Sequence, residues 1–194
     1  MKIIQLCSYK NFNSLFNKIN QPFHNIHHPF ILQKFIKLKC IDSMFNHIRQ
    51  HPQPFILVYD INIISKYLND IRITHDYKFK DIYKNNIEII VLIQKLLKLK
   101  SRIINEDTIH CELINKQLYG NTGKVLKIDM NNIHKLLHLN YIPIFSPIGV
   151  LHNKCYSDVY VHPEEITFYL FNHFDTISVD YLYCNDLNYL TLKM

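Results

Sequence analysis

The stretch from residue 120 to residue 150 constrains the fold of this chain more than any other part of the sequence. Polar and apolar side chains alternate over Lys124–Ile128, as in a half-buried strand. Asp129 can cap a following helix, because a carboxylate accepts from the free amides of a first helical turn. Asn140 can end that helix in a left-handed conformation, and Tyr141–Phe145 then has the pattern of a buried strand. Together these segments predict a βαβ unit, and with it an α/β fold built on an open, mostly parallel sheet with helices on both faces.

Glycine and proline mark the ends of the same stretch. Gly120 and Gly123 bracket the turn before its first strand, in a chain that has only three glycines. Pro143 is expected near the start of its strand, where a missing amide costs least. Gly149 is expected in a tight turn after the strand, at a position that a β-carbon would strain.

This combination of glycines, strand, helix and proline-containing strand resembles the amino-acid-kinase superfamily, and is most similar to its branch of N-acetylglutamate kinases and synthases. The resemblance implies the N-terminal half of the amino-acid-kinase fold, as a truncated domain over residues 29–194. The residues that carry it are Gly120, Gly123, Val125, Ile128, Asp129, Ile142, Pro143, Ile144, Pro147 and Gly149.

Residues that the kinases of this superfamily use are missing at the matching positions. Those kinases hold phosphates with a lysine and a Gly-Gly pair near the first strand, whereas the first core strand is expected here at Pro29–Ile36, with Lys34 and no glycine. Their Asn-x-Asn-Ala-Asp signature is replaced by the sequence of Val159–Glu164. The resemblance therefore implies a kinase-inactive domain.

The resemblance implies that such a domain belongs to an N-acetylglutamate synthase of arginine biosynthesis, the enzyme that transfers the acetyl group of acetyl-CoA to glutamate. The chain would be a fragment of that acyltransferase or a regulatory subunit of it. No glycine follows Gly149, so the glycine-rich turn that binds coenzyme A is expected to be absent, and no cofactor is expected in this chain. The implied partners are a second copy of the chain or an N-acetylglutamate kinase, with arginine as a candidate effector.

Positive charge is concentrated at the N-terminal end. Residues 1–41 contain six lysines and no acidic residue, while the rest of the chain is balanced. We expect residues 1–28 to form a basic segment, which either targets the chain to the mitochondrial matrix or simply begins a cytoplasmic domain. The neutral remainder argues against a nucleic-acid interface.

The other elements are expected on either side of the central stretch. An apolar run over Phe55–Tyr59 predicts a strand covered on both faces, and Asp60 follows at its carboxyl end, where it either meets a ligand or caps the next helix; the cap is favoured. Tyr83–Lys100 predicts the longest helix. Its expected apolar face consists of Ile87, Ile90, Val91, Ile93, Leu96, Leu97 and Leu99.

Histidine spacing does not predict a metal centre. His134 and His138 lie four residues apart on one helical face, but Lys135 stands where a zinc-protease motif has glutamate, so a solvated face is expected. His47 and His51 have the same spacing, but they straddle a predicted helix end.

The remaining candidates are weaker still. His24, His27 and His28 have no acidic or cysteine partner nearby, and Cys111 beside His110 is not a dyad, because neighbouring strand residues point to opposite faces. The sequence thus predicts no catalytic, cofactor-binding or metal-binding residue.

Cysteine usage and hydropathy bound the class of protein. Five scattered cysteines without a C-x-x-C pair favour a reducing compartment over a disulfide scaffold. No apolar run approaches the ~18 residues of a membrane-spanning helix, so no membrane partner is expected.

Two alternative functions remain open at this point. A divergent amino-acid kinase would need Lys34 or Lys124 to replace the missing phosphate lysine. A non-enzymatic nucleic-acid or protein interaction module would use the basic N-terminal end.

Overall fold

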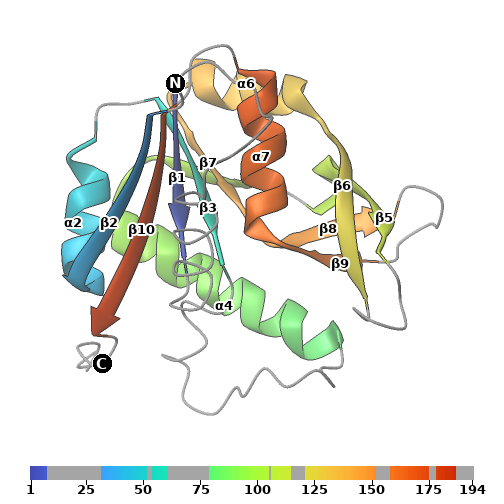
Figure 1. Ribbon diagram of the computed structural model, residues 1–194, viewed down its shortest axis with the longest axis horizontal. Helices are drawn as coiled ribbons and strands as arrows, with labels where there is room; N and C mark the ends of the chain where they lie inside the picture. Colours follow the sequence, from blue (N-terminus) through green and yellow to red (C-terminus); the bar gives the residue numbers. More distant parts are fainter. Residues whose placement is uncertain are drawn as a thin grey trace, which may run out of the picture.

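The computed structural model of the chain describes residues 1–7, 32–51, 54–60, 79–104, 106–114, 121–151, 158–174 and 178–186. These residues form an α/β fold with a six-stranded sheet, a small four-stranded barrel and four α-helices (Figure 1). The predicted fold class, α/β with a mostly parallel sheet, is confirmed at this level.

The six-stranded sheet has the order β2-β10-β1-β3-β7-β4, and every neighbouring pair is parallel. The pattern of continuous apolar runs explains this arrangement, because parallel strands are covered by helices on both faces. All five residues of β3 are buried. The strands are β1 (Lys2–Leu6), β2 (Leu32–Cys40), β3 (Phe55–Tyr59), β4 (Ser101–Ile104), β7 (Ile142–Phe145) and β10 (Ser178–Asp186).

The first core strand is β1, which corrects the prediction that it lies at Pro29–Ile36. β1 pairs with β10 on one side and β3 on the other, so it lies at the centre of the sheet. The strand predicted at Pro29–Ile36 is β2, at the sheet edge. Residues 2–6, expected to belong to a separate basic segment, are therefore part of the fold.

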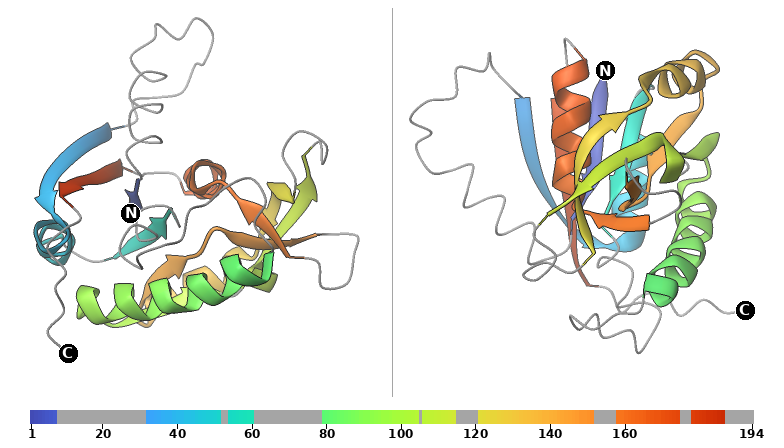
Figure 2. Two further views of the ribbon diagram at one scale, coloured as in Figure 1. Left: turned by 90° about the horizontal axis from the view of Figure 1, so that it is seen from below. Right: turned by 90° about the vertical axis from the view of Figure 1, so that its right-hand side faces the viewer.

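Helices cover both faces of the sheet. α2 (Ile41–Arg49) and α4 (Phe79–Leu97) pack on one face, and α6 (Met130–His138) and α7 (Pro163–His173) pack on the other. Figure 2 shows α4 and α7 on opposite sides of the strands. α7 begins with Pro163 in its first turn, where its missing amide costs nothing.

The barrel lies on the α6 and α7 side of the sheet. It consists of β5 (Ile109–Leu113), β6 (Thr122–Ile128), β9 (Asp158–Val161) and β8 (Ile148–Leu151), in that order, with a 3₁₀ turn at Glu106–Thr108 before β5. The pairs β5–β6 and β8–β9 are antiparallel, and the pairs β5–β8 and β6–β9 are parallel. The barrel thus adds a second layer over one face of the sheet.

The predicted boundaries of α6 are confirmed by its caps. The Asp129 carboxylate accepts from the Asn131 amide at 3.1 Å. At the other end Asn140 has a φ of 57°, its amide donates to Leu137 O, and the Tyr141 amide donates to Leu136 O. This is a Schellman motif, in which a left-handed residue lets the chain satisfy the last free carbonyls.

The prediction of a βαβ unit around α6 is wrong in one respect. β6 belongs to the barrel and β7 to the six-stranded sheet, so α6 connects two sheets rather than two strands of one sheet. The local pattern of strand, helix and strand is present. Its pairing partners, however, lie far away in the sequence and are not fixed by that pattern.

Gly149 also differs from its prediction. It lies within β8 and not in a turn, opposite Val159 of β9. A β-carbon at Gly149 would lie 2.8 Å from the Ile109 carbonyl oxygen. The position therefore requires glycine because β5 approaches closely, and the structure records no left-handed backbone there.

Pro143 lies near the start of β7, as predicted. The Ile142 amide donates to Lys100 O on the β4 side, so the Pro143 nitrogen faces the β3 side. The pairing of β3 with β7 begins only at Ile144. A missing amide at Pro143 therefore falls at the end of that ladder.

α4 is present, and its predicted apolar face is partly right, because Ile90, Ile93 and Leu97 are buried as expected. Ile87 and Val91 are 50% and 58% exposed, although both were expected on the apolar face. The buried stripe is formed by Asn86, Ile89, Ile90, Ile93 and Leu97, whose spacing follows the helical repeat.

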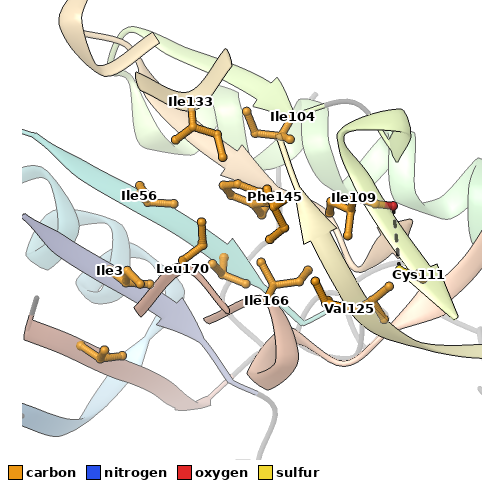
Figure 3. Packing of buried hydrophobic residues seen from close by; sticks show 14 of the residues in the cluster. Ile3, Ile56, Ile104, Ile109, Cys111, Val125, Ile133, Phe145, Ile166 and Leu170 are labelled. Atoms are coloured by element: carbon orange, nitrogen blue, oxygen red, sulfur yellow. Dashed lines mark hydrogen bonds between the residues drawn. The ribbon is translucent and has the colours of Figure 1, made fainter. Parts of the chain in front are cut away.

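Two apolar clusters hold the layers together. One lies between the sheet and the helices α2 and α4. The other lies between the sheet, the barrel, α6 and α7, and is drawn in Figure 3 with Phe145 at its centre. The sheet strands contribute alternate residues to the two clusters, as Ile3 and Ile4 of β1 illustrate.

Candidate functional site

The carboxyl ends of β1 and β3 meet at one edge of the sheet, beside the middle of β10. The Cys7 amide after β1 donates to Leu182 O of β10 at 2.9 Å, and the Asp60 amide after β3 donates to Leu6 O at 3.1 Å. Asp60 is fully buried. In an open parallel sheet this is the edge where ligands bind, so these residues define the candidate site.

The N-terminal end of α7 reaches the same place. Glu164 lies in the first turn of α7. Its charge acts, together with that of Asp60, on the Cys7 thiol and on the Tyr160 hydroxyl of β9. Strands β1, β3 and β9 and helix α7 therefore bring two carboxylates, a thiol and a phenol into one electrostatic environment.

Gln5 is a buried polar residue in the layer between β1 and α7. Its side-chain carbonyl accepts from the Thr167 hydroxyl at 2.7 Å. Its amide nitrogen is buried and has no hydrogen-bond partner among the described residues. A buried donor without a partner is costly in a folded protein, so this amide is a candidate contact for a bound acceptor.

Burial keeps the thiol and phenol groups of this edge protonated. Desolvation, followed by the charges of Glu164 and Asp60, raises the pKa of Cys7 well above its usual value. Desolvation likewise raises the pKa of Tyr160 and Tyr181, and negative neighbours add to the effect. Cys7 is therefore a neutral thiol at pH 7 and not a thiolate nucleophile.

The arrangement suits a cation better than a phosphate. Pro163 removes one amide from the first turn of α7, and Glu164 and Glu165 place negative charge where a helix would otherwise attract an anion. Gly123 and Gly149, the two glycines that the structure describes, both lie in the barrel. The described part of the edge thus lacks the glycine-rich cradle of a phosphate site.

Lys34 and Lys124, either of which was considered as the phosphate lysine of a divergent kinase, lie in different sheets. Lys34 is in β2 at the edge of the six-stranded sheet, and Lys124 is exposed on β6 of the barrel, opposite Glu112. Of the N-terminal lysines, Lys2 is partly buried in an ion pair with Asp180 at 3.0 Å. Lys2 is therefore committed to an intramolecular contact.

The histidine pairs behave differently from one another. His134 and His138 are exposed on α6, and His134 packs edge-on against Phe174. His47 and His51, set aside in the sequence, come within hydrogen-bond distance of each other. The segment of His24, His27 and His28 lies outside the described residues. So does the helix that Asp60 was expected to cap, because residues 61–78 are not described.

Sequence reasoning missed the polar residues of this edge other than Asp60. Gln5 carried a usable signal, since it is the one uncharged polar residue within the strand Lys2–Leu6. Cys7 and Glu164 carried none, because a single cysteine or a glutamate in a first helical turn is common.

Comparison with known proteins adds little to this picture. No family model and no curated protein matches the chain. A crystal structure of smu.665 from Streptococcus mutans UA159 is similar at 14% identity and a TM-score of 0.49, over 75% of this chain and 70% of that chain. That likeness is too slight to bear on activity or ligand. Among the described helices, none has the length and hydropathy needed to span a bilayer.

Proposed function

We propose that this chain is a kinase-inactive, amino-acid-kinase-like domain that binds a cationic amino acid, with arginine as the first candidate. In this role it would act as a regulatory part of an N-acetylglutamate synthase system. The observation that carries the proposal is that buried Asp60 follows β3 at the carboxyl edge of the parallel sheet, where its charge and that of Glu164 both act on Cys7 and Tyr160.

Charge complementarity supports a cationic ligand. An ammonium or guanidinium group gains from two carboxylates in a partly desolvated setting. The buried amide of Gln5 can donate to a carboxylate or carbonyl of the same ligand. An α-amino acid with a basic side chain offers both kinds of group.

The same residues argue against phosphoryl transfer. Phosphoryl transfer depends on backbone amides and a positive side chain around the phosphates. The described start of α7 instead presents proline and two glutamates. Repulsion between these carboxylates and a nucleotide triphosphate supports a binding role over a kinase role.

Isothermal titration calorimetry of the full chain tests the proposal. We expect L-arginine to bind and Mg-ATP not to bind. Asp60→Asn should weaken arginine binding at least tenfold, which is about 1.4 kcal/mol, and Glu164→Gln should weaken it as well. Glu164 is only half-buried, so Glu164→Gln is expected to fold and tests the site even if Asp60→Asn fails to fold.

Asp129→Asn is the matched control. It also removes one carboxylate, but at the exposed cap of α6, where asparagine caps equally well. Its arginine affinity should equal that of the wild type. Binding of Mg-ATP would favour the divergent kinase, and arginine affinity unchanged in both Asp60→Asn and Glu164→Gln would refute the proposed site.

A further inference from the structure

A second cluster of chemically active side chains lies at the opposite edge of the sheet. His47 belongs to the last turns of α2, His51 follows that helix, and Asp180 lies near the start of β10. Lys2, which begins β1, lies beside them. This is the amino edge of the parallel strands, on the face covered by α2 and α4, so the cluster is separate from the site around Asp60.

The end of α2 explains why the two histidines meet. The Gln50 amide is shared between Asn46 O at 3.3 Å and His47 O at 3.2 Å, and the His51 amide donates to Ile48 O at 3.1 Å. The helix therefore tightens into a 3₁₀ turn as it ends beyond Arg49. His51 therefore stays on the same side of the helix as His47.

The distances between the donor atoms match those of a metal site. His51 Nε2 lies 3.1 Å from His47 Nε2 and 3.3 Å from Asp180 Oδ2. Ligand atoms at ~2.0–2.1 Å from a tetrahedral zinc ion are about 3.3 Å apart. One donor atom from each of the three residues lies within 4.8 Å of the others.

A buried, unpartnered atom points independently to a missing ligand. The Asp180 side chain is 1% exposed, and its Oδ1 has no hydrogen-bond partner among the described residues. A buried carboxylate oxygen normally has a donor or a cation beside it. The C-terminal end of α2 adds the negative end of a helix dipole to the same place.

We propose that His47, His51 and Asp180 form a binding site for one divalent transition-metal ion of the zinc class. Two imidazole nitrogens and one carboxylate are ligands that Zn²⁺ accepts, and water can fill the fourth position. The ion would tie α2 to β10, and so fix the amino edge of the sheet. This inference does not depend on the proposed function.

Lys2 holds the site in its metal-free state. Its ammonium donates to Asp180 Oδ2 at 3.0 Å and lies 3.3 Å from His51 Nδ1, which must then accept. In that tautomer the proton of His51 is on Nε2. Coordination through Nε2 requires the proton on Nδ1 instead, so the ammonium must move away. Lys2 thus competes with the metal for Asp180 and His51.

Zinc titration of the metal-free full chain, against a chromophoric chelator, tests this site. We expect one ion per chain and a higher melting temperature with excess Zn²⁺. His47→Ala and Asp180→Asn should each lower the affinity at least tenfold. Lys2→Met should raise it severalfold, because the competing ammonium is gone; a purely structural ion-pair network does not predict that gain.

The second histidine pair provides the matched control. His134→Ala/His138→Ala removes two histidines at the same spacing from an exposed helix without a buried carboxylate, and it should leave zinc affinity unchanged. His47 is only half-buried, so His47→Ala is expected to fold, and its circular dichroism verifies this. The proposal fails if the wild type binds no zinc, if folded His47→Ala binds as well as the wild type, or if the control variant loses the binding.

Discussion

At the scale of single residues, β5 leaves no space for a side chain at Gly149. A β-carbon there would lie 2.7 Å from Cys111 Sγ and 2.8 Å from the Ile109 carbonyl oxygen. The carbonyl belongs to the backbone, so it cannot move aside without disturbing the pairing of β5 with β8. We expect Gly149→Ala to lower the free energy of unfolding by about 1–3 kcal/mol, and Gly149→Val by more, as measured by chemical denaturation.

The neighbouring residue provides the control for Gly149. Val150 is half-buried in the same strand, and Val150→Ala should cost about 1 kcal/mol or less. A Gly149→Ala protein that unfolds at the wild-type denaturant midpoint would show that β5 does not approach as described.

Cys111 makes stability depend on pH in the alkaline range. Its burial raises the pKa of the thiol from 9.0 to about 12. Between these values the unfolded chain loses a proton that the folded chain retains, so the folded state is progressively disfavoured. Its contribution is fully present below pH 9 and decreases above it, with a slope of about 1.4 kcal/mol per pH unit for one group.

Denaturation at a series of pH values from 7 to 11 measures this slope. Cys111→Ala removes the thiol and should make the decrease above pH 9 shallower by up to that amount. The raised pKa values of Cys7, Tyr59, Tyr160 and Tyr181 act in the same direction, so some decrease persists. If the unfolding free energy of Cys111→Ala falls with pH as steeply as that of the wild type, Cys111 ionises as freely in the folded chain as in the unfolded chain.

At the scale of elements, α4 offers a sharp comparison between its two stripes. Ile89 is fully buried and Ile87 is 50% exposed. Ile89→Ala should cost about 2–5 kcal/mol, as expected for a cavity in a packed core, and Ile87→Ala should cost well under half as much. Thermal or chemical unfolding of the two variants measures this difference. A larger loss of stability in Ile87→Ala than in Ile89→Ala would mean that Ile87 lies on the buried face, as the sequence predicts.

The elements differ in how far the sequence predicts them, for physical reasons. α6 is predicted to the residue, because its signals are local: Asp129 satisfies a first-turn amide and Asn140 adopts a left-handed conformation. The buried stripe of α4 is predicted only in part, because apolar residues occupy nearly every turn of the helix and only tertiary contacts select Ile89 over Ile87 and Val91. The partners of β6 and β7 are likewise set by distant strands.

The candidate sites show the same limit. Asp60 at a strand end was recognisable from its position after an apolar run, although its role was assigned to capping. The meeting of His47 with Asp180 was not, because it joins residues far apart in the chain and depends on one extra 3₁₀ turn after α2. Spacing alone made His134 and His138 an equal candidate, and the fold leaves them on an exposed helix.

At the scale of the whole molecule, both candidate sites are organised by β1. Near the carboxyl end of β1, Gln5 and Cys7 face the layer of α7. At the amino end of β1, Lys2 faces the layer of α2. A ligand at one edge and a metal ion at the other would therefore act on the same central strand. The proposed ion would thus influence the geometry of the proposed binding site through β1, without touching the ligand.

The position of β1 leads to a prediction about the N-terminal residues. β1 is the only strand that joins β2 and β10 to β3, β7 and β4 in the described sheet, and Ile3, Ile4 and Leu6 are fully buried. A chain that begins at residue 8 loses both ladders and this apolar area, so we expect no cooperative unfolding transition in calorimetry.

Within β1, Ile4→Asp should destabilise the full chain by several kcal/mol, because it buries an unpaired carboxylate. Lys37→Asp, at an exposed position of edge strand β2, should stay close to the wild type. If the shortened chain melts cooperatively at the wild-type temperature, β1 is not a central strand, and both candidate sites lose the element that places their residues.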